Sequence, residues 1–497
     1  MKKTILVAAV MFLGLTAAAF AQATYSVGSI PVTTVTASGQ TERTGDVTFT
    51  QISGVSNAGT ITIRYGVPIT VDLATVVITA PAGSGYLAPN LPTVNIGASS
   101  AASGQLVINV PALVAAGSFS VSGCRVAVAG TGLSSLAANL SAVGNAIVAG
   151  QTTVTVISSI AAGLASVGGT GLAASVSGVA PAAVVANMRA TEGYLSAFGL
   201  VGEAGNTTTV NIRFTLDKVP PTGVTLTFPL AVASGANNWF ACDATGVALA
   251  TAPQITSTST TLSVQYAIAT GTNNTAIENL TVPVDVTFAS TPRPISSSVI
   301  SYTATLAPIG TAYTSSGGLI ASPIPRFAAV EVGPATLLTI VGAQTTLIIP
   351  FASSLPAIGY NTGFSIANTT ADPGTDIVGY TGAIKQTGKI TFVMYPQLPP
   401  GGSTLPGPYT YTTSGTSPGT GLNAAGELPA GSTYTVLLSQ LLAAGGAPDN
   451  FQGYIMAVTG FTNAHCLYVL SNFAGFTQGA QALVVTGART AAEGLNN

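Results

Sequence analysis

The sequence predicts an all-β protein made of antiparallel β-sandwich domains in series, and three observations lead to this prediction. Apolar residues alternate with Thr, Ser and Asn in many short segments, which is the period of half-buried strands. The chain contains 57 Gly and 29 Pro residues, which favour frequent tight turns. No segment with helical periodicity is convincing beyond about 12 residues.

The first domain is expected over residues 22–186. The segment 61–67 alternates apolar and polar side chains, which predicts a strand with one buried face. Within 119–128 the apolar residues change parity at Gly123. A β-bulge at this glycine would re-aim all later side chains, so we expect one there.

The second domain is expected over residues 190–333 and carries the clearest alternation. Two alternating segments, 209–216 and 224–228, flank a turn rich in Pro and Gly, which predicts an antiparallel hairpin. A later segment, 280–288, also alternates but contains Pro283. Because proline has no N–H to donate to a ladder, this strand is expected at an edge or a bulge.

The third domain is expected over residues 337–490. Its strongest strand signal is the run 451–470, which is dense in Tyr, Ile, Val and Phe. A break at Thr459-Gly460 would divide this run into two strands. A short helix is expected over 437–444, and the Pro- and Gly-rich segment 398–421 predicts a long loop.

Several blocks of the third domain also carry a resemblance. These blocks are Pro350-Phe351, 361–373, 430–434, 451–455, Ala464-His465 and 478–484. In them the domain resembles a module of secreted, functionally uncharacterised multidomain proteins of soil bacteria. The resemblance implies export and a β-rich fold, and it supplies no activity and no catalytic residue. Such modules often carry a cysteine shortly before the histidine, whereas here Thr459 precedes and Cys466 follows it.

The N-terminus predicts export. Lys2 and Lys3 form a basic start, 5–15 is apolar, and Ala19-Phe20-Ala21 matches a cleavage site, so residues 1–21 are expected to be a removed signal peptide. The apolar run is shorter than the roughly 20 residues of a spanning helix. We therefore expect an extracellular or cell-surface protein with no transmembrane helix in the mature chain.

The charge of the chain limits its partners. Only 6 % of its residues are charged and the formal net charge is −2, and no basic cluster is available to neutralise phosphates, so nucleic acid is not an expected partner. A nearly neutral surface covered by Thr and Ser hydroxyls does little to keep molecules apart. Self-association, or binding to surface polymers and glycans, is therefore expected.

Few residues could serve catalysis. His465 is the only histidine, and no G-x-S-x-G sequence supplies a serine nucleophile. The neighbouring Cys466 is expected on the opposite face of the same strand, which argues against a Cys/His pair. We therefore expect no enzymatic activity.

Cofactors and metals are not expected either. The chain has 15 carboxylates, and Asp372 and Asp376 are predicted to be turn residues, with calcium binding as the alternative. The three cysteines, Cys124, Cys242 and Cys466, fall in different predicted domains. Buried free thiols are expected, and a bridge between domains or molecules is the alternative.

Four aromatic residues, Trp239, Tyr395, Tyr409 and Tyr411, are candidate ligand-binding residues. They are expected in or near loops, where their rings could stack on sugars. The alternative is that they pack over the edges of the sandwiches.

Together these observations predict an exported, non-enzymatic structural or adhesive protein of immunoglobulin-like sandwiches. A carbohydrate-binding surface protein is the alternative function, and an outer-membrane β-barrel is the alternative fold. The three-part organisation and the scarcity of aromatic residues argue against the barrel.

Overall fold

The computed structural model confirms an all-β fold. The residues that it describes are 22–168, 174–177, 183–195, 197–198, 211–235, 237–270, 276–289, 295–307, 327–372, 374, 378–379, 382–398, 407–486 and 494–496. The predicted signal peptide, residues 1–21, lies outside them. The described residues form seven sheets and three hydrophobic cores, one core for each sandwich.

The first sandwich packs a five-stranded sheet against a six-stranded one. The five-stranded sheet has the order β12 (Ala146–Ile147), β1 (Thr24–Ile30), β4 (Asp46–Ser53), β9 (Gly117–Ser122), β6 (Val77–Thr79). The six-stranded sheet has the order β2 (Val32–Thr36), β13 (Thr153–Ala161), β11 (Leu136–Val143), β5 (Gly59–Arg64), β8 (Gln105–Val110), β7 (Thr93–Val94). Most pairs are antiparallel, whereas β1–β12 and β2–β13 are parallel.

The phase change at Gly123 has a clear structural cause. Gly123 follows the end of β9 and adopts φ +79°, a left-handed conformation that glycine adopts without steric cost. The chain then enters β10 (Arg125–Val126), which pairs with β3 (Glu42–Arg43) in a separate two-stranded sheet. The apolar parity therefore changes because the chain leaves one sheet for another.

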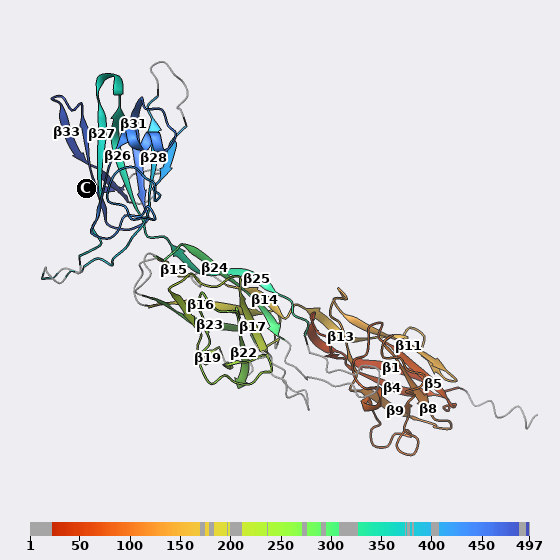
Figure 1. Cartoon of the computed structure of the whole chain (residues 1–497). Coiled ribbons are helices and arrows are strands. Elements are labelled where there is room, and N and C mark those ends of the chain that lie inside the picture. Colours follow the sequence, from red (N-terminus) through yellow and green to blue (C-terminus); the bar gives the residue numbers. More distant parts are fainter. Residues whose placement is uncertain are drawn as a thin grey trace, which may run out of the picture.

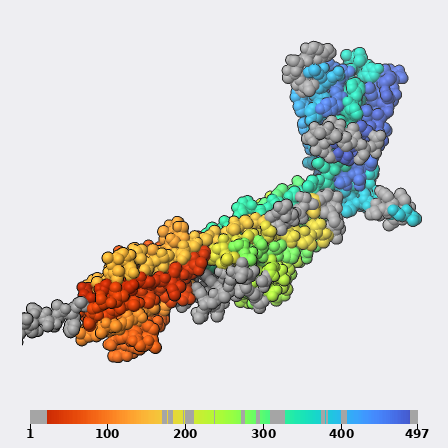
Figure 2. Space-filling view, turned by 180° about the vertical axis from the view of Figure 1, so that it is seen from behind, coloured from red at the N-terminus to blue at the C-terminus, as the bar shows by residue number. Residues whose placement is uncertain are grey.

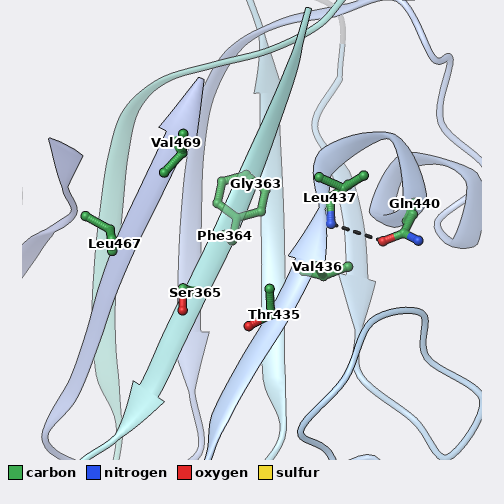
Figure 3. Close-up of a pocket in the computed structure, with 9 residues that line it drawn as sticks. All are labelled: Gly363, Phe364, Ser365, Thr435, Val436, Leu437, Gln440, Leu467 and Val469. Carbon is green, nitrogen blue, oxygen red and sulfur yellow. Dashed lines mark hydrogen bonds between the residues drawn. The ribbon is translucent and has the colours of Figure 1, made fainter. Parts of the chain in front are cut away.

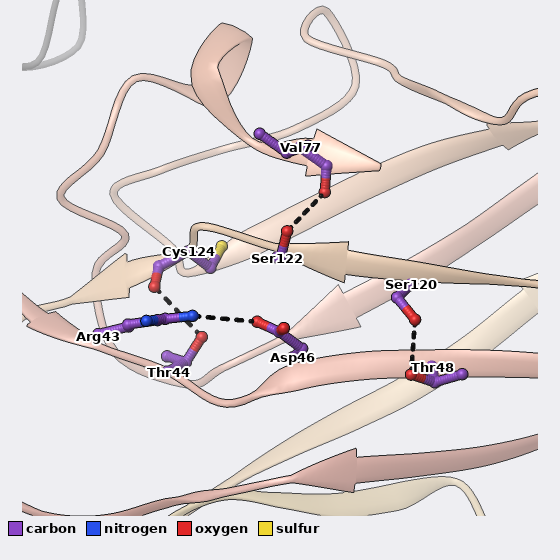
Figure 4. A network of polar contacts seen from close by, with 8 residues as sticks. All are labelled: Arg43, Thr44, Asp46, Thr48, Val77, Ser120, Ser122 and Cys124. Atoms are coloured by element: carbon purple, nitrogen blue, oxygen red, sulfur yellow. Dashed lines mark hydrogen bonds and ion pairs between the residues drawn. The ribbon is translucent and has the colours of Figure 1, made fainter. Parts of the chain in front are cut away.

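Side-chain hydroxyl groups form hydrogen bonds between neighbouring strands of this sandwich (Figure 4). Thr48 and Ser120 face each other across β4 and β9, and their hydroxyl oxygens lie 2.7 Å apart. Ser122 donates to the Val77 carbonyl at 3.3 Å, and Arg43 pairs with Asp46 at 3.8 Å. Neutral hydroxyl contacts and one ion pair thus link neighbouring segments of this sandwich.

The second sandwich packs a five-stranded sheet against a seven-stranded one. The five-stranded sheet has the order β14 (Leu164–Val167), β16 (Ala183–Glu192), β23 (Asn279–Phe288), β18 (Val224–Thr227), β21 (Gln254–Ile255). The seven-stranded sheet has the order β15 (Ala174–Ser177), β25 (Val332–Val341), β24 (Ser298–Ala307), β17 (Asn211–Leu216), β22 (Ser263–Thr270), β20 (Asn237–Cys242), β19 (Ala231–Ser234).

Two sequence predictions for this unit need correction. The strands β17 and β18 exist, but the predicted hairpin between them is wrong, because β17 lies in the seven-stranded sheet and β18 in the five-stranded one. The strand β23, which contains Pro283, is not an edge strand, since β16 and β18 flank it. Its pairing with β18 stops at Asp285, however, so Pro283 has a neighbouring strand on one side only.

The boundary between the first two units also falls earlier than residue 186. Strand β13 ends at Ala161 in the first sandwich, and β14 begins at Leu164 in the second. Strand β16 pairs along its length with β23 of the second unit. The described strands between residues 164 and 186, which the sequence predicts in the first domain, therefore belong to the second.

The third sandwich contains the only α-helix among the described residues, α2 (Leu438–Ala444), close to the predicted position. One sheet has the order β29 (Tyr409–Thr412), β28 (Ile390–Pro396), β31 (Phe451–Thr459), β26 (Thr345–Ser354), β34 (Leu483–Thr486), β35 (Gly494–Asn496). The other has the order β30 (Thr433–Leu437), β27 (Asn361–Asn368), β32 (Ala464–Ser471), β33 (Thr477–Gln481). The two halves of the run 451–470 thus lie in opposite sheets.

The three units follow one another in space as they do in sequence (Figure 1). The first two lie end to end, and the third is set at an angle at the far end (Figure 2). Ala162 and Gly163 alone separate β13 from β14, and residues 342–344 separate β25 from β26. Such short connections leave little freedom between consecutive units.

The junction between the first two units is also hydrogen-bonded. The Ala328 N–H donates to the Ser38 carbonyl at 2.7 Å, next to an isolated bridge between Gly39 and Phe327. The hydroxyl oxygens of Thr36 and Tyr194 lie 2.6 Å apart. Residues that follow the second unit's β24 in sequence thus return to bind a loop of the first unit.

Candidate functional site

His465 and Cys466 point to opposite sides of β32. His465 is exposed on the outer face of its sheet, whereas Cys466 is buried in the core of the third sandwich. The alternation of side chains along a strand separates the imidazole from the thiol. A Cys/His pair therefore does not form at these two positions.

The three cysteines are free and buried, as the sequence predicted. Burial raises the pKa of the Cys124 and Cys242 thiols to about 11 each. Burial likewise raises the pKa of the Cys466 thiol to about 12. Because the thiolate is the reactive form, these groups are chemically inert near neutral pH in the folded chain.

Trp239, one of the four candidate ligand-binding residues, lies in the interior. It is only 1 % exposed in β20, and its ring meets that of Phe198 edge-on at 5.5 Å between centroids. The prediction that Trp239 lies in or near a loop is wrong. Its strand parity aims it at the core of the second sandwich, so it cannot stack on an external sugar.

Tyr409 and Tyr411 belong to the short edge strand β29, inside the segment predicted to be a loop. They are half-buried against the core of the third sandwich, and they face Met394 and Phe392 of β28. The Tyr411 hydroxyl lies 2.6 Å from that of Ser417. Both rings thus pack over the edge of the sandwich, which is the alternative predicted from the sequence.

Tyr395 is the one candidate that the structure leaves on an outer face. It lies directly opposite Tyr454 in the pairing of β28 with β31. The two rings are stacked, with centroids 4.7 Å apart and planes 9° from parallel. Such a pair contributes about 0.5–1.5 kcal/mol beyond its buried area, so each ring holds the other in a fixed orientation.

A β-bulge in the neighbouring strand β26 adds a third ring. Ile349 pairs with Ile455 and Ala352 with Gly453, which leaves Pro350 and Phe351 opposite Tyr454. Phe351 is 43 % exposed and Tyr454 is 38 % exposed. We call Tyr395, Tyr454 and Phe351 the aromatic strip. It crosses three adjacent strands, which in a sheet are about 4.8 Å apart.

Two members of the aromatic strip, Tyr454 and Phe351, are not among the candidates predicted from the sequence. The parity of β31 contained the signal for Tyr454, because Phe451, Gly453 and Ile455 face inward and leave Tyr454 outside. Phe351 could not be placed in this way. The bulge changes the parity of β26 at residues 350–351, and Pro350 is the residue type that signals such a bulge.

The opposite sheet of the third unit carries a shallow groove of about 380 Å³ (Figure 3). Gly363 lies between its pairing partners Leu437 and Val469, and its missing side chain opens the groove. The hydroxyls of Ser365 and Thr435 lie toward one end (Figure 3). The Gln440 side chain accepts a hydrogen bond from the Leu437 N–H at 3.1 Å. All lining residues are uncharged.

Within the described residues, no group of three or more His, Cys, Asp or Glu side chains is arranged to hold a metal ion. Asp372 accepts a hydrogen bond from the Ala383 N–H at 3.1 Å, and Asp376 lies outside the described residues. The described part of the chain contains no helix with the length and apolar character needed to span a membrane.

No protein-family model matches the chain, and no curated protein is detectably similar to it. The resemblance of the third domain to secreted modules of soil bacteria therefore stays a prediction. What can be inferred about function rests on the geometry of the three sandwiches and of their surfaces.

Proposed function

We propose that the protein is an exported, non-enzymatic structural or adhesive component of a cell surface or extracellular matrix. The observation that carries this proposal is the junction between the first two units, where the Ser38–Ala328 hydrogen bond and the Thr36–Tyr194 contact join consecutive sandwiches. A surface component of this kind needs to hold a contact-making domain at a distance. Fixed junctions serve that need, because a flexible linker would let the units fold back on each other.

Solution scattering of the purified mature protein tests the structural part of this proposal. A compact chain of this length has a radius of gyration of about 23 Å. We expect a value at least half as large again, because the units lie in series (Figure 1). A radius of gyration near that of a compact globule would contradict the proposal.

The location is tested separately. We expect the protein in the extracellular or surface-attached fraction, with Gln22 as its first residue after removal of residues 1–21. N-terminal sequencing of the exported protein measures this directly. Recovery of the intact chain from the cytoplasm alone would overturn the proposed export.

A second function, carbohydrate binding, is favoured by the aromatic strip. Flat aromatic rings offer apolar faces to the C–H groups of a sugar ring. The stacking of Tyr395 on Tyr454 fixes both rings before a ligand arrives, so little side-chain freedom would be lost on binding. The strip also spans three strands, which gives an extended polysaccharide several contacts in a row.

Pull-down with insoluble cellulose, chitin and peptidoglycan tests this second function. If a glycan binds the strip, Tyr454→Ala should weaken its binding at least tenfold, equivalent to about 1.4 kcal/mol. Ile358→Ala is the matched control, because Ile358 is an exposed aliphatic residue of the same unit that belongs neither to the strip nor to the groove of Figure 3. Equal binding by wild type and Tyr454→Ala would contradict a role of the strip.

A further inference from the structure

A buried acidic cluster lies at one end of the second sandwich. Glu192, at the end of β16, is 1 % exposed, and Glu278, just before β23, is 6 % exposed. Their backbones are linked, since the Glu192 N–H donates to the Glu278 carbonyl at 2.9 Å. Two buried acidic residues are thus held next to each other.

Main-chain N–H groups donate hydrogen bonds to both carboxylate oxygens of Glu192. Its two carboxylate oxygens accept hydrogen bonds from the N–H groups of Phe198 at 2.8 Å and Glu278 at 3.0 Å. Burial raises the pKa of the Glu192 carboxyl, and the neighbouring Glu278 adds to the rise. Glu192 therefore acts as a fixed element of the fold.

Glu278, in contrast, has an oxygen with no partner. Its Oε2 accepts a hydrogen bond from the Asn237 Nδ2, but its Oε1 is buried and makes no hydrogen bond. Asn237 is 2 % exposed, and its Oδ1 is likewise buried without a partner. Because the Nδ2 and Oδ1 of Asn237 belong to one small planar amide, its orphan oxygen lies beside the same carboxylate.

This arrangement needs a compensating group. Among the described residues, neither Glu192 nor Glu278 forms an ion pair with Lys, Arg or His. Buried charges are found paired with opposite charges or bound to metal ions, since an isolated one carries a large desolvation cost. Two orphan acceptors with surplus negative charge are what a bound cation would satisfy.

We propose that Glu278 and Asn237 form part of a calcium-binding site beneath the turn between β19 and β20. A Cβ placed on Gly235 in that turn would lie 3.8 Å from the Glu278 Oε1, which locates the orphan oxygen under the turn. Calcium takes six to eight oxygen ligands, including amide and main-chain oxygens, in irregular geometry. Glu278 and Asn237 supply two side-chain oxygens, and main-chain carbonyls and water belong to the same ligand class.

The oxygen-only ligand set separates calcium from other metals. Zinc sites are built mainly from Cys and His, and the only histidine, His465, lies in the third unit. Magnesium demands near-ideal octahedral geometry and keeps several waters, which suits a buried site poorly. An exported protein would also meet calcium at the concentrations that extracellular modules bind, about 10⁻⁴–10⁻³ M.

Trp239 provides a built-in reporter. It is the only tryptophan of the chain, it lies two residues after Asn237 on the same inward side of β20, and its indole N–H is buried without a hydrogen bond. Calcium added to the full-length protein after treatment with EDTA should change tryptophan fluorescence in a saturable way. The melting temperature of the second unit should rise by roughly 5 °C.

Three variants make the test specific. Glu278→Gln keeps the size of the side chain and should weaken calcium binding at least tenfold. Asn237→Asp adds a carboxylate and should tighten binding. Asp285→Asn, an exposed carboxylate on β23, removes the same charge as Glu278→Gln and should bind calcium like wild type.

Two results would overturn the proposal. One is the absence of a saturable change in tryptophan fluorescence up to about 10 mM calcium, together with a Glu278→Gln variant that is as stable as wild type. That concentration lies above the range that extracellular modules bind. The other is a calcium response that persists in Glu278→Gln, which would place the ion elsewhere. If Glu278→Gln does not fold, the change in the stability of Asn237→Asp with calcium present decides between the two cases. Without a bound cation, the added negative charge can only destabilise the fold.

Discussion

At the scale of single residues, Trp239 is the side chain whose packing matters most to the second unit. It is the largest fully buried side chain of the chain, and it meets Phe198 edge-on. Truncation of a buried tryptophan leaves a cavity and costs about 3–5 kcal/mol. In Trp239→Ala we therefore expect the melting transition of the second unit to fall by about 10 °C in calorimetry.

Trp239→Phe is the control for this prediction, because it keeps an aromatic ring in the core and should cost less than Trp239→Ala. A change of less than about 0.5 kcal/mol in Trp239→Ala, as expected of a surface site, would contradict the interior placement. The same calorimetric traces distinguish the three units, since a multidomain chain does not melt in one two-state step.

Residue type alone misled the choice of candidate residues. Trp239 is a candidate because an exposed tryptophan ring can stack on a sugar. Burial alternates along β20, however, and places Trp239 on the inward face. Tyr454 lies in an apolar run and is not a predicted candidate, yet the same kind of alternation places it on the outer face. Strand parity, applied residue by residue, would have corrected both assignments. Parity alone does not place Phe351, because the bulge at Pro350-Phe351 interrupts the alternation of β26.

At the scale of elements, alternation predicted the strands well and their partners poorly. The segments around Ile61, Phe214 and Val284 were recognised because their inner faces are buried and their outer faces are wet. Alternation fixes which face is buried, but both sheets of a sandwich bury a face against the same core. The sequence around Pro220-Pro221 therefore fits a hairpin and a crossing between sheets equally, and the chain makes the crossing.

Glycine-rich segments were the second source of error at this scale. The predicted first domain extends to residue 186 and so includes β14 and β15. These two strands instead border both sheets of the second unit, where β15 runs parallel to β25. Small residues carry little information on which face is buried, so long-range pairing decided their place.

At the scale of the whole molecule, the function proposed here depends on how the first two units are joined. Two glycines allow the close approach at that junction. A Cβ on Gly193 would lie 1.8 Å from the main-chain carbonyl oxygen of Ala162, and a Cβ on Gly163 would lie 2.3 Å from the Leu306 Cδ1. A side-chain methyl can move aside, whereas a main-chain oxygen moves only with the chain. The junction therefore tolerates a side chain at Gly193 less well than one at Gly163.

We expect Gly193→Ala to loosen the junction while each sandwich stays folded. The added methyl must displace Ala162 and break the hydrogen bond from the Gly193 N–H to the Gly163 carbonyl, which is 2.9 Å long. Limited proteolysis should then cut near residues 162–163 at least tenfold faster than in wild type, and solution scattering should report a wider range of shapes. Gly163→Ala should have a smaller effect in both measurements.

Gly28→Ala is the matched control, because Gly28 lies in β1 of the first unit and a Cβ there meets nothing within 4 Å. It should leave both the cleavage rate and the scattering unchanged. If Gly193→Ala were also indistinguishable from wild type, the close approach at the junction would not restrain the units. A chain whose units swing freely cannot hold its terminal domain at a set distance, so that result would remove the main support for a structural role.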